Sequence, residues 1–238
     1  MNPTAAMLVI GDEILSGRTR DANMHYLAGE LTGVGINLQE VRIVSDKTSQ
    51  IVNALQMLRS AYTYVFTSGG IGPTHDDITA DAVAEAFAVS IDVRADAHAL
   101  LKAHYKRQGL ELNEARLRMA RIPEGACLID NPVSIAPGFC LENVYVMAGV
   151  PKVFQAMVAS ALPSLIGGAP LLSETLRVMR GEGDLATPLA QVAAAFPDLS
   201  FGSYPFQKDG VYGSNLVVRG TDKTLLEQGI AALEKALA

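Results

Sequence analysis

The sequence predicts an α/β fold, in which helices cover both faces of a mostly parallel sheet to give three α/β/α layers, followed by a small α+β domain. Short apolar runs alternate with helical patterns over most of the 238 residues, which is typical of parallel sheets covered by helices. The cluster Gly167-Gly168-Ala169-Pro170 then interrupts this pattern. Because domains commonly contain roughly 100–200 residues, we expect two of them, residues 1–168 and residues 171–238.

Composition narrows the class of protein. Hydrophobic residues make up 49% of the chain and charged residues 18%, which predicts a folded core rather than disorder. The net charge is −6 and no basic block occurs, so we expect no nucleic-acid partner. No basic segment precedes the first apolar run, and no stretch of about 18 apolar residues occurs. We therefore expect neither export nor membrane insertion, and a cytoplasmic location.

The chain has two cysteines, Cys127 and Cys140. Their spacing matches neither a zinc-binding pair nor a disulfide framework. We expect both thiols to be reduced, buried and structural.

The first predicted strand is the apolar run 5–10, which stops at Gly11-Asp12 as a buried parallel strand stops at a functional loop. Apolar residues then recur at helical or strand spacing through the rest of the first domain. In chain order these patterns predict a helix at 22–31, a strand at 38–44, a helix from 48 or 49, a strand at 63–67, and helices at 80–87, 97–105 and 114–119.

The second half of the chain begins with a predicted loop. Residues 125–138 contain two prolines and little periodicity, which indicates a long loop. Residues 139–147 predict a hairpin that turns at Glu142-Asn143, and Pro151 begins a helix. For the small domain the patterns predict a strand at 175–179, a helix at 185–195, strands at 200–204 and 214–218, and a helix at 223–237.

The third strand runs into a glycine-rich loop, Thr67-Ser68-Gly69-Gly70-Ile71-Gly72-Pro73-Thr74-His75-Asp76-Asp77-Ile78-Thr79. Glycines after a strand let the backbone turn tightly and present N–H groups to an anion, and the following helix adds its positive end. A plain strand-to-helix turn uses the same residues. The adjacent carboxylates Asp76 and Asp77 cap the helix or, if a phosphate binds, require a cation between them and the phosphate.

Acidic residues also follow the first two strands. Asp12 comes after the first strand and Asp46 after the second, and open parallel sheets bind ligands at this edge. Hard oxygen ligands suit Mg²⁺ or Mn²⁺. Ser16 lies in the turn after the first strand, where it can contact a phosphate or cap a helix. We therefore predict a site for a phosphorylated small molecule with a divalent metal on Asp12, Asp76 and Asp77.

Two segments carry a resemblance to a known family. Residues 11–17, Gly-Asp-Glu-Ile-Leu-Ser-Gly, and residues 69–79 are similar to the two signatures of the molybdopterin-binding fold. More narrowly, residues 5 to about 166 resemble the N-terminal part of the competence/damage-inducible protein A family and the related domain of eukaryotic FAD synthases. Asn131-Pro132 to Pro137-Gly138-Phe139 and Ala148-Gly149-Val150-Pro151 are two further family-like stretches.

The resemblance implies a domain that binds molybdopterin or a nucleotide diphosphate across the strand ends. It implies hydrolysis of ADP-ribose-like pyrophosphates with a divalent metal (Mg²⁺, Mn²⁺ or Co²⁺) for bacterial members. For molybdenum-cofactor members it implies adenylylation of the pterin, supported by the residues matching Asp46 and Asp77. The expected ligand-binding residues are Gly69, Gly70, Gly72, Pro73, Thr74, Ser16, Asn131 and Gly138.

Two hypotheses follow. The first is metal-dependent hydrolysis of a nucleoside-diphosphate-linked molecule such as ADP-ribose or FAD, with Asp46 and Asp77 as catalytic residues and Asp46 orienting the water or acting as base. The alternative is a non-hydrolytic molybdopterin-binding protein in the biosynthesis or handling of the molybdenum cofactor. Apolar loops near Ile135 and the small domain offer surfaces for a homo-oligomer.

Overall fold

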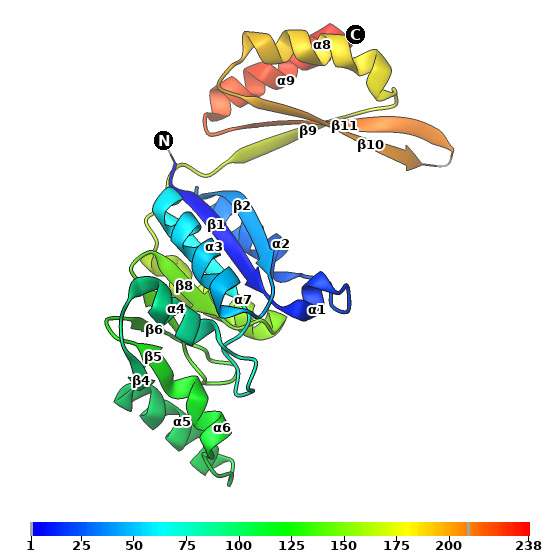
Figure 1. The fold of residues 1–238 in the computed structure, drawn as a ribbon. Helices are drawn as coiled ribbons and strands as arrows, with labels where there is room; N and C mark the ends of the chain where they lie inside the picture. Colours follow the sequence, from blue (N-terminus) through cyan, green and yellow to red (C-terminus); the bar gives the residue numbers. More distant parts are fainter. Residues whose placement is uncertain (1, 209) are drawn as a thin grey trace. The chain divides into compact units, whose positions relative to one another are not determined.

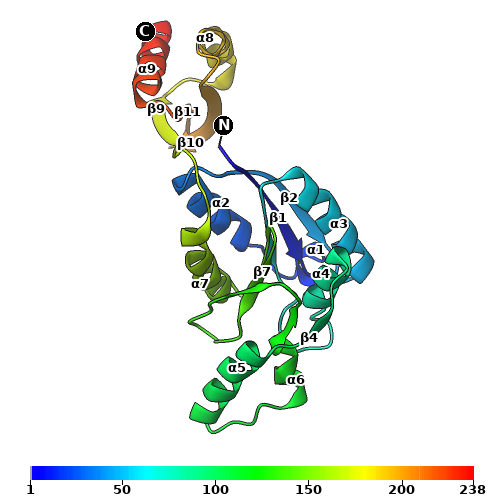
Figure 2. The same cartoon turned by 90° about the vertical axis from the view of Figure 1, so that its left-hand side faces the viewer.

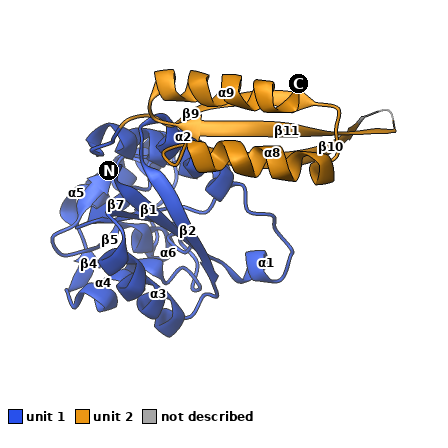
Figure 3. Ribbon diagram, turned by 90° about the horizontal axis from the view of Figure 1, so that it is seen from above, with its two compact units in different colours: residues 1–168 blue, residues 169–238 orange. Residues whose placement is uncertain are grey.

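The computed structural model describes residues 2–208 and 210–238, and the chain divides into two compact units, Met1–Gly168 and Ala169–Ala238 (Figure 3). A six-stranded sheet forms the centre of the first unit. Its strands, in spatial order, are β2 (Asn37–Val44), β1 (Thr4–Ile10), β3 (Tyr64–Ser68), β8 (Val144–Met147), β7 (Gly138–Leu141) and β6 (Cys127–Ile129). The first four run parallel, while β7 and β6 are antiparallel to their neighbours. The predicted mostly parallel sheet is confirmed.

Helices cover both faces of this sheet (Figure 2). On one face lie α3 (Thr48–Ala61) and α4 (Thr79–Phe87), and on the other lie α2 (Asn23–Gly33) and α7 (Pro151–Ala161). Successive side chains of β1 alternate between these two cores, Ala6, Leu8 and Ile10 on the α3 side and Ala5, Met7 and Val9 on the α2 side. A strand buried on both faces needs apolar residues at every position, which explains why β1 is a continuous apolar run. The three predicted layers are confirmed.

A small antiparallel pair extends the first unit. Strand β4 (Ile91–Val93) pairs with β5 (Arg121–Pro123), next to α5 (Ala95–Arg107), α6 (Glu114–Leu117) and a 3₁₀ turn over Arg118–Ala120. The sequence predicted neither strand, because three residues are too few to establish an alternating pattern. The loop predicted over 125–138 is wrong at its start, since β6 lies within it and pairs with β7. The short helix α1 (Asp12–Leu15) was also not predicted.

The two cysteines face each other across strands β6 and β7, where Cys127 and Cys140 are direct register partners. The expectation that both are buried is wrong for Cys127, which is exposed, whereas Cys140 is half-buried. Edge strand β6 has only one neighbour in the sheet, and this position leaves one side of Cys127 open to solvent.

We predict that Cys127 reacts with a thiol reagent at neutral pH well before Cys140 does. Burial raises the pKa of the Cys140 thiol, so its reactive thiolate forms only at a pH above that of an ordinary cysteine. Mass spectrometry after timed labelling at several pH values measures both rates. Denatured protein is the control, in which the two sites should react alike; equal rates in the native protein would contradict the prediction.

The second unit contains β9 (Leu172–Val178), α8 (Glu182–Ala195), β10 (Ser200–Lys208), β11 (Val211–Gly220) and α9 (Lys223–Leu237). Its antiparallel sheet has the order β10-β11-β9, and both helices lie on one face of it (Figure 1). Leu185, Leu216, Val218 and Leu233 are among the residues of its separate core. The predicted small α+β domain is confirmed. Across residues 2–208 and 210–238, no helix has the length and apolarity needed to cross a membrane.

Candidate functional site

The glycine loop begins where β3 ends, and two of its glycines have conformations that other residues rarely adopt. Gly69 has φ 109° and Gly70 has φ 69°. A Cβ on Gly69 would lie 2.2 Å from the carbonyl oxygen of Ile10, and one on Gly70 would lie 2.1 Å from Thr79 Oγ1. The buried Thr79 hydroxyl donates to the Gly69 carbonyl at 3.0 Å. The loop therefore packs tightly between the end of β1 and the start of α4, and both positions require glycine.

Asp77 holds the outer part of the loop together. One carboxylate oxygen accepts from the Gly72 N–H at 2.6 Å, and the other accepts from the Thr74 N–H at 2.8 Å and the Thr74 hydroxyl at 2.5 Å. Both oxygens of Asp77 thus have donors from within the loop. These contacts make Asp77 an organiser of the loop's shape.

The ends of β1 and β2 are joined by another acidic residue. Asp46, which is half-buried, accepts a hydrogen bond from the Asp12 N–H at 2.8 Å through Oδ2. The Asp12 side chain is exposed, and Ser16 lies at the end of α1, where its hydroxyl donates to the Glu13 carbonyl at 3.4 Å. The backbone N–H of Asp12 therefore holds the Asp46 carboxylate at the ends of β1 and β2.

Two buried asparagines position the remaining walls. Asn131 donates to Ser134 Oγ at 2.6 Å and to the Ala136 carbonyl at 2.8 Å, which closes the loop between β6 and β7. Asn23, at the start of α2, donates to Ser68 Oγ and to the Gly149 carbonyl, both at 2.8 Å. Asn131 thus fixes the shape of its own loop, whereas Asn23 connects α2 to the end of β3 and to the loop before α7.

These loops surround a cavity of about 620 Å³. Its lining includes eight of the predicted site residues: Asp46, Gly69, Gly70, Gly72, Pro73, Asp76, Asp77 and Asn131. Four others lie outside the lining: Asp12, Ser16, Thr74 and Gly138. Gly138 instead permits the close approach of β7 and β8, because a Cβ there would lie 2.5 Å from the Val146 carbonyl oxygen.

Sequence reasoning did not assign several of the cavity's residues. Glu13 lines it, although the sequence identified only its neighbour Asp12 as a metal ligand; nothing in the sequence showed which of the two side chains faces inward. Ser134 and Gly149 also line it, in stretches that the resemblance marked. The apolar part of the wall is formed by Ile71, Met119, Ala136, Ala148, Val150, Val153 and Met157.

The charged side chains that line the cavity are all acidic. Four carboxylates line it, from Glu13, Asp46, Asp76 and Asp77, and none of the described lining residues is Lys, Arg or His. Hydrogen bonding from the Thr74 side chain lowers the pKa of Asp76, so this exposed carboxylate stays ionised at neutral pH. An anion can enter such a cavity only with a compensating cation, whereas the apolar wall suits a flat ring system.

The side chains that line the cavity do not form a complete set of metal ligands. Within residues 2–208 and 210–238, no three His, Cys, Asp or Glu side chains are grouped so as to hold a metal ion, and of the predicted ligands only Asp76 and Asp77 line the cavity. Mg²⁺ commonly binds through one or two carboxylates plus the phosphates of a substrate, and keeps several waters. Besides Asp77, the carboxylates that the cavity presents are those of Glu13, Asp46 and Asp76.

Each of the two units matches a known protein family. Residues 6–167 match the family described as "probable molybdopterin binding domain", and residues 170–238 match "FAD synthase, middle domain". The chain is 33% identical over 260 residues to a "probable FAD synthase" of Caenorhabditis elegans, covering 99% of this chain and 50% of that protein. The chain spans about half the length of the two Caenorhabditis relatives that it matches.

Other relatives are matched over more of their own length. A protein of Caldivirga maquilingensis is 34% identical over 181 residues, covering 74% of this chain and 70% of that protein. Among solved structures, the protein CinA of Thermoplasma acidophilum, described as of unknown function, is 32% identical with a TM-score of 0.63. That match covers 68% of this chain and 97% of the CinA chain.

Proposed function

Since the chain belongs to the molybdopterin-binding domain family, we propose that its first unit binds a nucleotide through its diphosphate and hydrolyses that diphosphate with a divalent cation. ADP-ribose and FAD are the proposed substrates. FAD is included because the chain is similar to a protein named a probable FAD synthase, and its second unit matches the middle domain of FAD synthase.

One observation carries this proposal: the glycine loop and four carboxylates line a single cavity of about 620 Å³. Glycine turns after a strand can present backbone N–H groups to phosphate. The Gly69 N–H donates to the Met147 carbonyl and the Gly72 N–H to Asp77, so the N–H groups of Gly70 and Ile71 would make the phosphate contact. Ligand pockets commonly measure roughly 300–1,000 Å³, so the cavity can accept a large part of a dinucleotide. The apolar wall would hold its flat ring.

Each group of residues at the cavity would have a separate role in hydrolysis. The glycine loop would hold the diphosphate, and the carboxylates of Glu13 and Asp76 would be the one or two protein ligands of a cation that the phosphates also bind. When bound, a divalent cation neutralises phosphate charge and lowers the pKa of a coordinated water. Asp46 Oδ1 would accept the proton of the attacking water, while its Oδ2 keeps the hydrogen bond from Asp12 N–H at 2.8 Å. Water then splits the P–O–P bridge, and FAD gives AMP and FMN.

Incubation of the purified protein with FAD or ADP-ribose and Mg²⁺, Mn²⁺ or Co²⁺ tests the proposal. We expect AMP release that stops when the cation is chelated. Replacement of Asp46 by Asn should lower the rate by about 100-fold or more, because general-base catalysis contributes roughly 10²–10⁴-fold. No AMP from any dinucleotide with any of these ions would contradict hydrolysis.

A second candidate is a molybdopterin-binding protein that does not cut its ligand. It is favoured by the contacts of Asp77, whose oxygens already accept three hydrogen bonds from the loop. With both of its oxygens committed to the loop, Asp77 would not act in catalysis, and the site would hold a ligand without activating water. A fluorescent pterin that copurifies with the protein, or tight pterin binding without AMP release, would support this candidate over the first.

A further inference from the structure

Three arginines lie in the segment from α6 to β5, and two of them have evident structural partners. Arg121 forms two hydrogen bonds of 2.7 Å with the Asp81 carboxylate. Arg116 donates to the Glu111 carbonyl and stacks on Tyr105, with its Cζ 4.6 Å from the ring centroid. These two side chains stabilise the small antiparallel part of the first unit.

Arg118 differs from both. Within the described part of the chain its side chain makes one hydrogen bond, from Nη2 to the Asp77 carbonyl at 3.2 Å, and no ion pair involves it among residues 2–208 and 210–238. Its Nε is buried and has no acceptor there. A guanidinium offers five N–H donors, and a buried donor without an acceptor is unfavourable. The Arg118 guanidinium therefore has N–H groups that can donate hydrogen bonds to an anion.

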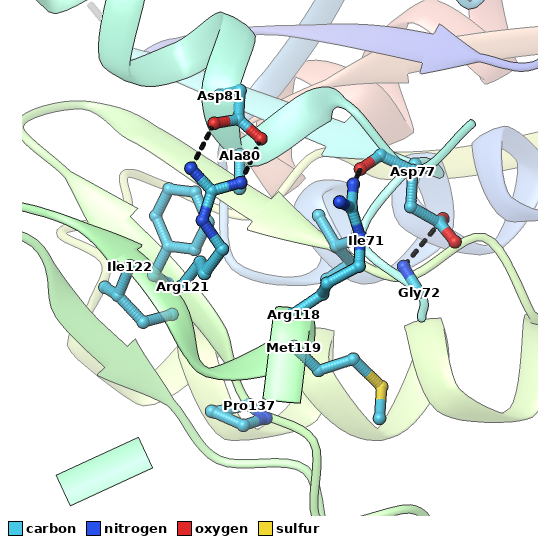
Figure 4. Close-up of a pocket in the computed structure, with 12 residues that line it drawn as sticks. Ile71, Gly72, Asp77, Ala80, Asp81, Arg118, Met119, Arg121, Ile122 and Pro137 are labelled. Atoms are coloured by element: carbon cyan, nitrogen blue, oxygen red, sulfur yellow. Dashed lines mark hydrogen bonds and ion pairs between the residues drawn. The ribbon is translucent and has the colours of Figure 1, made fainter. Parts of the chain in front are cut away.

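The position of Arg118 connects it to the candidate site. It lines a small pocket of about 20 Å³ together with Gly70, Gly72 and Asp77 (Figure 4). Such a volume holds about one water-sized group, which is also the size of a single phosphate oxygen. Gly70, Ile71, Gly72, Asp77 and Met119 line both this pocket and the large cavity, so the two spaces adjoin across the glycine loop.

We propose that Arg118 binds a phosphate oxygen of the nucleotide, which enters the small pocket between the guanidinium and the glycine loop. The inference rests on the proposed function, and it identifies the positive side chain that the large cavity lacks. Guanidinium groups bind phosphate through charge-assisted hydrogen bonds with directed geometry. Since Arg118 also donates to the Asp77 carbonyl, a bound phosphate would couple the ligand to the loop that Asp77 organises.

Titration calorimetry with FAD and with inorganic pyrophosphate, in the presence of Mg²⁺, tests this role. We expect Arg118→Gln to weaken both ligands by roughly 10- to 100-fold, as for loss of a charge-assisted contact. Arg118→Lys keeps the charge and should remain within about tenfold of the wild-type affinity. Arg116→Gln removes the same charge two positions earlier in the chain and should bind as the wild type does. Melting curves confirm that each variant is folded.

The outcomes separate the two proposals. If the wild-type protein binds neither ligand, the proposed function and the role of Arg118 fail together. If it binds them but Arg118→Gln binds equally well, the role of Arg118 alone is wrong. Equal losses in Arg118→Gln and Arg118→Lys that are accompanied by a matching fall in melting temperature would overturn the role, because Arg118 would then only support the loop through the Asp77 carbonyl. Binding of FAD without AMP release would contradict the proposed hydrolysis but would still agree with a contact between Arg118 and phosphate.

Discussion

Replacement of Gly69 by alanine is expected to lower the free energy of unfolding of the first unit by about 3 kcal/mol, because alanine adds a backbone clash to a strained conformation. The new Cβ would lie 2.2 Å from the Ile10 carbonyl oxygen at a φ of 109°. This carbonyl belongs to the last residue of β1, which has a neighbouring strand on each side, so its movement would disturb the sheet. For a unit of this size the loss corresponds to a fall in melting temperature of roughly 6–12 °C. Thermal and urea unfolding measure it.

A second glycine provides the matched control. Gly29 lies inside α2, and no heavy atom would come within 4 Å of an added Cβ. Gly29→Ala should leave the protein as stable as the wild type or stabilise it by up to about 1 kcal/mol, since alanine favours helix more than glycine does. A Gly69→Ala variant that unfolds together with wild-type protein would show that the loop adapts, and that the contact with Ile10 does not require glycine.

Much of the fold could be predicted because its main signals are local. The continuous apolar run of β1 follows from its burial on two faces, which Ala5 and Ala6 illustrate by packing into different cores. The start of α7 at Pro151 follows from the fixed φ of proline, which suits the first turn of a helix. Strands β4 and β5 could not be predicted, since their pairing depends on segments about thirty residues apart that meet only in the folded chain.

The sequence predicted where the candidate site lies better than it predicted what each of its residues does. Residues that follow parallel strands gather at one edge, and this rule identified Asp46 and the glycine loop. It could not show that Glu13 lines the cavity while Asp12 does not, because neighbouring side chains on a short helix point in different directions. Nor could it identify Arg118, which approaches the loop from a distant 3₁₀ turn.

The roles of the adjacent carboxylates Asp76 and Asp77 can be separated by matched Asp→Asn variants. Asp77→Asn should weaken nucleotide binding or turnover by about 100-fold, the order of loss caused by misplacing a site by roughly 1 Å. It should also cost about 1–3 kcal/mol of stability. The reason is geometric: an amide has one acceptor oxygen, so its NH₂ group must face either the Gly72 N–H or the Thr74 donors that now bind the carboxylate.

Asp76→Asn makes the same chemical change at the neighbouring position. Its carboxylate is 64% exposed, so the melting temperature should stay that of the wild type, while the concentration of Mg²⁺ needed for binding or turnover should rise if the carboxylate helps to hold the ion. Melting curves and titrations of both variants against Mg²⁺ give the comparison. A stable Asp77→Asn variant whose only defect is a higher Mg²⁺ requirement would reverse the assignment, because Asp77 would then act through its charge on the cation and not through the shape of the loop.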